Sequence, residues 1–540
     1  SFLQRDESGR YQMHELVRQY AAEQLLAQPG EMDAARDAHC AYYCSALEAW
    51  GAQLRGPQYR STLQVMDLEL DNIRTAWAWA TANAHISQIE RAAEPLAHYY
   101  DARWRDPECS AAMHAAAETL EVTASAEGLH ALITVLAWEA RYCDDLDRAQ
   151  RTLERCLVLL ERPELAHTDT RRVRALVLDS MAYSHLLRQA APTRALACVD
   201  ESLTLYRALA DRWGLLRALT TACMVRRFAF DLAEAERLGQ EAVSVARALG
   251  HLEQVAWNLT LVSNVVHFQG DYERGEHLGR EAVALYRQLG DRLGVALGLS
   301  QLSTLLINQG KFADTRAVGL ESIQILRELG REDLVSMPAL WLGYAEMCLG
   351  NYAEAKAQLE IKLAGRDADG LGGPFALMGL AQLAIASGHA ERAIQLQRQC
   401  VAMMRQVNEH LALAGSLAVL AAILVTAGLP EEARPHLVES LCLIDAHPYP
   451  TPPSQLLAAS ALFLAQEGDV ERATEVWALA ASHRLVSDSR WFQDVFGTPI
   501  TAAAQALPPP ARVAAEERGR VRDIRQTVKE LLADLRPDSN

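Results

Sequence analysis

The chain has 540 residues, of which 50% are hydrophobic and 22% are charged, and its formal net charge at pH 7 is -17. This composition is typical of a globular protein with ample apolar surface to bury. The acidic balance argues against direct nucleic-acid binding, because phosphates require clustered Lys and Arg. The ten cysteines include no Cys-x-x-Cys pair, so reduced thiols in the cytoplasm are expected.

A β-hairpin is predicted at the start of the chain, with Ser1 to Arg5 and Arg10 to Gln12 around a Glu7-Ser8-Gly9 turn. The stretch from Arg10 to Ala21, which contains Met13-His14-Glu15, resembles the end of the winged-helix subdomain in signal-transduction ATPases with numerous domains (STAND proteins). In that family a Met-His-Asp phrase opens the last helix, and its histidine contacts the β-phosphate of ADP. The resemblance implies that His14 contacts this phosphate in a full-length protein that binds ATP or ADP. The alternative is a helix-start histidine with a local hydrogen bond.

A helical linker or degenerate repeats are expected over residues 31–125. The phrase from Asp67 to Trp77 resembles the helical stretch that STAND proteins carry between ATPase and repeats. Cys40 and Cys44 lie one helical turn apart beside His39. Buried thiols are the favoured interpretation of this pair, and a metal pair is the alternative.

A short phrase recurs at forty-residue intervals in the middle of the chain: Gly270-Asp271-Tyr272, Gly310-Lys311-Phe312 and Gly350-Asn351-Tyr352. After a two-residue slip it continues at Gly388, Gly428 and Gly468, and Phe230 keeps the frame upstream without glycine. Small residues precede and follow each turn at fixed distances. The preceding column is Cys223, Ser263, Ser303, Gly343, Ala381, Ala421 and Ala461, and the following column is Ala235, Gly275, Thr315, Ala355, Ala393, Ala433 and Ala473. Two such columns permit two antiparallel helices to approach closely around a tight turn.

This pattern resembles the tetratricopeptide repeat (TPR), with longer units like those of kinesin light chain and the maltose-regulon activator. HEAT and armadillo repeats have periods of about 40–47 residues but lack the turn phrase. The predicted fold is therefore all-α: a TPR-like, right-handed α-solenoid of helix hairpins with a period of about 40 residues, and a small winged-helix remnant at its N-terminus. We divide the chain into the end of a winged-helix domain (1–30), the linker (31–125), the solenoid (126–482) and C-terminal capping helices (483–540).

The stretch from Leu411 to Leu429 carries no charge, but it keeps the repeat register. We expect a buried first helix there rather than a membrane span, for which about 20 apolar residues would suffice. At the far end, Ser489 to Phe492 resembles the tail of such regulators, and Ala511 to Leu535 predicts one long charged helix that caps the solenoid.

The first helices of the hairpins are expected to line a concave groove that binds a protein, a peptide or a small inducer. Counting back from the turns places the following residues on its wall: Arg217, Met224, Arg227, Trp257, Asn264, His267, Thr304, Asn308 and Tyr344. For any single residue, a solvated or self-packed side chain is the alternative.

No catalytic residues, metal ligands or cofactor are predicted in this part of the protein, because it contains no Gly-x-x-x-x-Gly-Lys-Ser/Thr loop and no His-Glu-x-x-His motif. The resemblance implies the C-terminal part of a longer protein, with the ATPase domain upstream in cis and self-association on activation. The favoured function is a ligand- or protein-sensing module that relays binding to a nucleotide switch, in transcriptional regulation or prokaryotic defence. The alternatives are a constitutive protein-protein scaffold and, less favoured, a helical enzyme.

Overall fold

The computed structural model describes residues 3–5, 11–26, 30–188, 192–365, 372–406, 410–446 and 454–536. These residues form helices apart from one pair of short strands, as the predicted all-α class requires. The chain divides into two compact units. Unit 1 comprises Ser1–Ala229 and Ser244–His251, and unit 2 comprises Phe230–Val243 and Leu252–Asn540.

The predicted N-terminal hairpin is present. Strand β1 (Leu3–Arg5) pairs antiparallel with β2 (Tyr11–Met13), with Leu3 opposite Met13. The turn at residues 6–10 lies outside the described residues. Helix α1 (Glu15–Leu26) follows β2 directly. The assignment of this segment to a winged-helix domain stays a prediction.

The rest of unit 1 consists of helices joined by short turns. They are α2 (Glu31–Leu54), α3 (Tyr59–Ala82), α4 (Ile86–Ala102), α5 (Asp106–Leu120), α6 (Ala126–Arg141), α7 (Leu146–Leu160), the 3-10 turn η1 (Pro163–Leu165), α8 (Arg171–Leu187), α9 (Pro192–Ala208) and α10 (Arg212–Phe228). Helix α11 (Leu232–Leu249) contributes its first part to unit 2 and its last part to unit 1. Helices α4, α6, α8 and α10 pack side by side in that order and form an inner layer.

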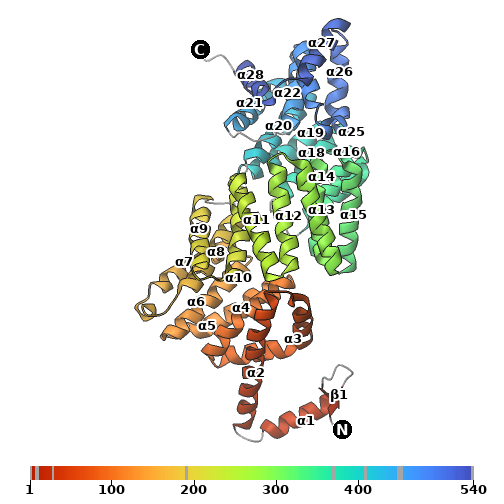
Figure 1. Cartoon of the computed structure of the whole chain (residues 1–540). Helices are drawn as coiled ribbons and strands as arrows, with labels where there is room; N and C mark the ends of the chain where they lie inside the picture. Colours follow the sequence, from red (N-terminus) through yellow and green to blue (C-terminus); the bar gives the residue numbers. More distant parts are fainter. Residues whose placement is uncertain are drawn as a thin grey trace. The chain divides into compact units, whose positions relative to one another are not determined.

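Unit 2 is a stack of helix hairpins (Figure 1). Its paired helices are α12 (Leu252–Phe268) with α13 (Tyr272–Leu289), α14 (Arg292–Asn308) with α15 (Phe312–Glu328), α16 (Ser336–Leu349) with α17 (Tyr352–Ala364), α18 (Gly372–Ala386) with α19 (Ala390–Met404), α20 (His410–Thr426) with α21 (Pro430–Ala446), and α22 (Ser454–Gln466) with α23 (Val470–Ala480). The 3-10 turn η2 (Glu332–Leu334) precedes α16. The hairpin boundaries follow the predicted turns.

The two small-residue columns meet inside the hairpins, as expected. A Cβ built on Gly275 would lie 3.1 Å from the carbonyl oxygen of Ser263, and one built on Gly343 would lie 3.2 Å from that of Ala355. Each of these pairs joins one residue of the column before the turn to one of the column after it. Larger side chains at these positions would force the two helices apart.

The first helix of each hairpin is more deeply buried than the second. In α20, every residue from Ala414 to Val425 is buried, whereas α21 buries mainly one face. The uncharged stretch from Leu411 to Leu429 is therefore an interior helix, as predicted. Among the residues that the structure describes, no helix has both the length and the apolar character that crossing a bilayer requires.

Ion pairs connect successive second helices on the outer surface of unit 2. Arg287 contacts Glu321 at 2.6 Å, Arg398 contacts Glu432 at 2.9 Å, and Arg405 contacts Glu439 at 2.7 Å. The partners are 34 residues apart in each pair, which places them on neighbouring hairpins. Their side chains are about half exposed, so each pair stabilises the stack by about 0–1 kcal/mol.

A C-terminal segment lies against the stack of unit 2. It contains α24 (Arg484–Ser487), α25 (Arg490–Phe492), a single π-helical turn η3 (Gln493–Gly497) and α26 (Thr498–Ala504). The rings of Trp491, Phe492 and Phe496 pack together and are almost fully buried. Tyr352 donates a hydrogen bond to the Asp494 carboxylate at 2.7 Å, which joins this segment to α17.

The predicted single helix from Ala511 to Leu535 is wrong, because two helices occupy this range: α27 (Pro509–Arg520) and α28 (Ile524–Leu535). Gly519 lies in the last turn of α27, where its backbone packs so closely against the carbonyl oxygen of Glu475 that no room is left for a Cβ. The Asp523 carboxylate then accepts a hydrogen bond from the backbone N–H of Gln526 at 2.8 Å and starts α28.

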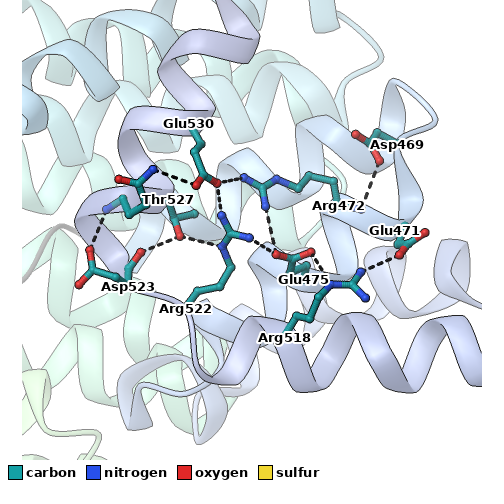
Figure 2. Close-up of polar contacts among 10 residues, drawn as sticks. Asp469, Glu471, Arg472, Glu475, Arg518, Arg522, Asp523, Thr527 and Glu530 are labelled. Atoms are coloured by element: carbon teal, nitrogen blue, oxygen red, sulfur yellow. Dashed lines mark hydrogen bonds and ion pairs between the residues drawn. The ribbon is translucent and has the colours of Figure 1, made fainter.

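A polar network holds these two helices against α23 (Figure 2). Glu475 is only 6% exposed and pairs with Arg472 at 3.1 Å, with Arg518 at 3.3 Å and with Arg522. Glu530 of α28 pairs with Arg472 at 2.6 Å and also with Arg522. The last hairpin of unit 2 is thus covered by charged helices, which is the capping role that a solenoid end requires.

Candidate functional site

The predicted groove residues divide between the two units. Arg217, Met224 and Arg227 lie on α10 in unit 1, and Trp257, Asn264 and His267 lie on α12 in unit 2. Thr304 and Asn308 lie on α14, and Tyr344 lies on α16, also in unit 2.

In unit 2 the structure brings several predicted residues together, but mainly in contacts with one another or with the fold. Asn308 contacts the Nε2 atom of His267 at 3.0 Å, and Asn264 donates to Gln301 at 3.2 Å. His267 is buried, and its burial lowers its pKa to about 4. The Tyr344 hydroxyl donates to the carbonyl oxygen of Phe375 at 2.7 Å, and the residue is 9% exposed. Tyr344 thus belongs to the core of unit 2.

His14 lies between β2 and α1 with an exposed side chain. Its Nδ1 atom accepts a hydrogen bond from the backbone N–H of Leu16 at 3.3 Å. This is the local contact of a helix-start histidine. Its contact with a nucleotide stays a prediction for the full-length protein.

The inner layer of unit 1 presents a buried ion cluster centred on Asp179 of α8. This carboxylate is fully buried and contacts Arg141 of α6 at 3.1 Å and Arg217 of α10 at 3.0 Å. Burial opposes the ionisation of Asp179, but the two guanidinium groups outweigh it and lower its pKa. The arrangement joins three successive inner helices through one charge.

A second ion cluster surrounds Glu94 of α4. Its carboxylate contacts Arg55 at 3.1 Å and Arg172 at 2.8 Å, and Arg172 also contacts Asp211 at 2.9 Å. Burial opposes the ionisation of Glu94, yet the positive charges around it hold its pKa well below the usual range. This chain of contacts connects the C-terminal end of α2 to the N-terminal ends of α8 and α10.

His98 lies one helical turn after Glu94 and is neutral at pH 7. Burial lowers its pKa to about 3 despite the nearby Glu94 carboxylate. The Trp213 indole N–H donates to His98 Nε2 at 3.2 Å, and this bond requires an unprotonated acceptor nitrogen. The ring therefore acts as a fixed spacer between α4 and α10.

A cavity of about 420 Å³ lies beside these clusters, within the usual range for small-molecule sites. Its wall combines acidic, basic and apolar side chains. The lining residues are Glu90, Glu94, His130, Thr134, Trp138, Asp169, Arg172, Val173, Leu176, Tyr206, Leu209, Gly214 and Arg217.

Two residues of this wall each carry a buried hydrogen-bond donor that has no partner among the residues that the structure describes. The donors are the indole Nε1 of Trp138, whose side chain is 1% exposed, and the Nε of Arg217. The guanidinium carbon of Arg217 lies 4.6 Å from the centroid of the Trp138 ring, so the two donors belong to stacked groups. A buried donor without an acceptor costs about 1–3 kcal/mol, so this place in the wall favours an occupant that accepts hydrogen bonds.

Arg217 is the one predicted groove residue that lines the cavity; the other lining residues were missed. A signal for some of them is present in the sequence. Arg141, Asp179 and Arg217 alternate in charge at intervals of 38 residues, which is one repeat. The wall position six residues before each turn, which selected Met224 and Asn264, also selects Trp138 when it is counted from the weak turn at Asp144.

The side chains that line the cavity are suited to binding a ligand. Its carboxylates and guanidinium groups already neutralise one another in pairs, and its histidine at position 130 contacts Glu90 at 2.7 Å. Within the described ranges, no group of three or more His, Cys, Asp or Glu side chains is arranged to hold a metal ion. Cys40 and Cys44 have sulfur atoms 3.9 Å apart in the core, where burial raises the pKa of Cys44 to about 12 and keeps it a thiol.

No protein-family model matches the chain. No curated protein sequence matches it either. Among solved structures, it is similar to a Rap protein complexed with competence and sporulation factor (12% identity, TM-score 0.49, covering 69% of this chain and 98% of that one). It is also similar to a STAND protein with a tetratricopeptide-repeat sensor from Pyrococcus horikoshii (12% identity, TM-score 0.48, covering 74% of this chain and 56% of that one). A third is the apo quorum sensor NprR from B. thuringiensis (12% identity, TM-score 0.47, covering 66% and 97%). Because all three scores are below 0.5, these similarities carry no argument about ligand or partner.

Proposed function

We propose that this chain is a ligand-sensing helical-repeat module whose ligand occupies the cavity of unit 1. The observation that carries the proposal is the pair of buried, unpartnered donors on Trp138 and Arg217 in the wall of a cavity of about 420 Å³. A purely structural core would pair such donors or exclude them, because leaving them unpaired lowers stability.

The position of the cavity supports a sensing role. Most of its lining residues come from α4, α6, α8 and α10, which pack against one another in series, and the others come from α9 and from the loops at Asp169 and Leu209. A ligand that contacts several of these helices stabilises the arrangement of helices to which it binds most tightly. It thereby shifts the population of helix arrangements by its difference in affinity between them.

We further propose that this shift is relayed to a nucleotide-switch domain upstream in cis. The support is the resemblance at Met13-His14-Glu15, together with the hairpin of β1 and β2 directly before it. In this proposal ATP or ADP binds the upstream domain, His14 contacts the nucleotide phosphate, and activation leads to self-association. A transcriptional or defence output follows from the same resemblance.

A thermal-unfolding screen tests the cavity. Leu176 lines it and is 7% exposed, so Leu176→Trp fills it, and Leu176→Met is the matched control of similar volume. The screen uses uncharged short peptides and small amides. Compounds that raise the Tm of the wild type and of Leu176→Met are expected to leave the Tm of Leu176→Trp unchanged. An equal response of all three proteins would place the binding elsewhere.

The competing function is a constitutive assembly scaffold without ligand switching. It is favoured by the exposed apolar side chains around α1, where Leu16 is 69% and Tyr20 is 63% exposed. The discriminating experiment measures nucleotide hydrolysis by the full-length protein, with and without a compound from the screen. A sensor changes its rate with the compound, whereas a scaffold does not.

A further inference from the structure

The charges around the cavity are balanced before any ligand enters. The charged lining residues belong to an ion-pair network that also includes Arg141, the second partner of Asp179, and this network comprises five carboxylates and five guanidinium groups. The carboxylates are Glu90, Glu94, Asp169, Asp179 and Asp211, and the arginines are Arg55, Arg141, Arg171, Arg172 and Arg217. A charged ligand group at this place would add an uncompensated charge to a partly buried cluster, which is costly.

The two unpartnered donors indicate that the ligand group bound here is a hydrogen-bond acceptor rather than a charged group. Nε1 of Trp138 and Nε of Arg217 are both N–H donors, and a carbonyl oxygen has two lone pairs with which to accept from both. The charge of Arg217 is already matched by Asp179 at 3.0 Å, so the acceptor has no need to be an anion. A neutral amide or ester carbonyl meets both requirements.

The apolar part of the wall specifies the remainder of the ligand. Val173, Leu176 and Tyr206 line the cavity and are each less than 9% exposed. Apolar surface of this kind binds aliphatic groups, because contact between them removes apolar area from water. The ligand therefore carries an apolar group next to its acceptor.

We propose that the cavity selects neutral amphipathic molecules in which a carbonyl group, bound by Trp138 and Arg217, stands beside an aliphatic group. This inference rests on the proposed function, because it names the ligand class of the same site. A capped apolar peptide and a small organic amide share this chemistry.

Three probes of similar size separate the charge alternatives: neutral N-acetyl-leucine methylamide, anionic N-acetyl-leucine and cationic leucine methylamide. The readout is the indole N–H resonance of Trp138 in the full chain labelled with ¹⁵N-tryptophan. Trp138→Phe assigns this signal among those of the ten tryptophans. The neutral probe is expected to shift the Trp138 signal and to bind about tenfold more tightly than either charged probe, because each charged probe brings one unpaired charge to the cluster.

Arg217→Lys provides a second test that keeps the positive charge beside Asp179 but removes the Nε donor. It is expected to weaken binding of the neutral probe about tenfold, as measured by the same titration. Arg226→Lys on the same helix, whose native guanidinium contacts Asp200 at 2.7 Å, is the matched control and should leave binding unchanged. This pair of variants also keeps the proposal testable if Trp138→Phe fails to fold.

The outcomes distinguish an error in the ligand class from an error in the binding site itself. If a charged probe binds as tightly as the neutral one, the ligand class is wrong while the cavity remains a binding site. If no probe moves the Trp138 signal and Arg217→Lys behaves like Arg226→Lys, the donors are satisfied by water alone. In that case the proposed function falls together with the inference.

Discussion

The indole nitrogen of Trp491 donates a hydrogen bond to the backbone carbonyl of Gln382 at 2.9 Å, across 109 residues of sequence. This bond fixes α25 to α18, so the C-terminal segment runs along several hairpins of unit 2 instead of ending beyond the last one. The same segment brings the carbonyl oxygen of Arg484 next to Gly310, at the turn between α14 and α15. Repeats that contact only their neighbours are here joined by a longer-range element.

Alanine substitution at two turn glycines tests this contact. A Cβ at Gly310 (φ +73°) would lie 2.7 Å from the Arg484 carbonyl oxygen, whereas Gly330 (φ +68°) has no atom within 4 Å. Each substitution is expected to lower the free energy of unfolding by about 1–2 kcal/mol, because alanine disfavours the left-handed backbone. Gly310→Ala is expected to lower it by about 1–3 kcal/mol more, because its Cβ overlaps the Arg484 carbonyl oxygen. Urea unfolding of both variants measures the difference. Equal losses would mean that the segment does not lie against this turn.

Removing the carboxylate between Arg141 and Arg217 is expected to destabilise unit 1 strongly. Asp179→Asn leaves two buried guanidinium groups without their partner, which costs about 3–5 kcal/mol. Asp314→Asn, at a residue whose side chain is 58% exposed and 4.0 Å from Arg280, should change stability by less than about 0.5 kcal/mol.

The destabilisation caused by Asp179→Asn is expected to depend on pH. The pKa of Asp179 is lower in the folded protein than in the unfolded chain, so its stabilising effect is present above pH ~4 and is lost as the pH falls through the folded pKa. The difference in unfolding free energy between wild type and Asp179→Asn should therefore narrow below pH ~4. Denaturant titrations between pH 2 and 7 (approximate limits) measure it; a constant difference would show that the carboxylate is not ionised in the native state.

His267 has the same sign of pH dependence in unit 2, over a higher pH interval. Its folded pKa of about 4 lies below the ordinary value near 6.5, so the unfolded chain binds the proton more readily and stability falls as the pH drops between these values. Across this interval the loss amounts to about 3 kcal/mol. His267→Gln should reduce this acid sensitivity, whereas His277→Gln, on the exposed surface of α13, should leave it unchanged. Unfolding of the three proteins at pH ~4.5 and ~7 compares them.

The C-terminal cap depends on one nearly buried carboxylate. Glu475→Gln weakens contacts to Arg472, Arg518 and Arg522 at once, so α27 and α28 should detach more often from α23. The control is Glu516→Gln, at a residue whose side chain is 38% exposed and pairs with Arg520 of the same helix at 3.2 Å. Hydrogen exchange of α27 and α28 is expected to accelerate about tenfold or more in the first variant and to stay near the wild-type rate in the second.

The sequence predicted unit 2 well because its turns require a left-handed backbone and use glycine to obtain it, as at Gly350 and Gly388. Several turns of unit 1 adopt the same conformation with other residues: Ala84, Trp104 and Ala210 have φ values of 50°, 53° and 52°. The glycine signal is therefore missing there, although the hairpins form. Tertiary packing supplies the energy that a left-handed non-glycine residue costs.

The candidate site was predictable only in part for the same reason. Arg217 was found because it lies one helix before Phe230, where the repeat register still holds. Trp138 and Glu94 lie in the region of irregular turns, and the pairing of Glu94 with Arg172 spans 78 residues. A contact at that distance follows from how three helices pack, which a short periodic pattern does not encode. The alternating charges of Arg141, Asp179 and Arg217 are the clearest indication of the candidate site in the sequence alone.

The ion pairs between successive outer helices of unit 2 have a mechanical consequence. They are exposed, so dissolved ions weaken them, while the apolar contacts between the hairpins are unaffected or strengthened by salt. We therefore expect the resistance of unit 2 to bending to decrease as the ionic strength rises, with no change in its fold.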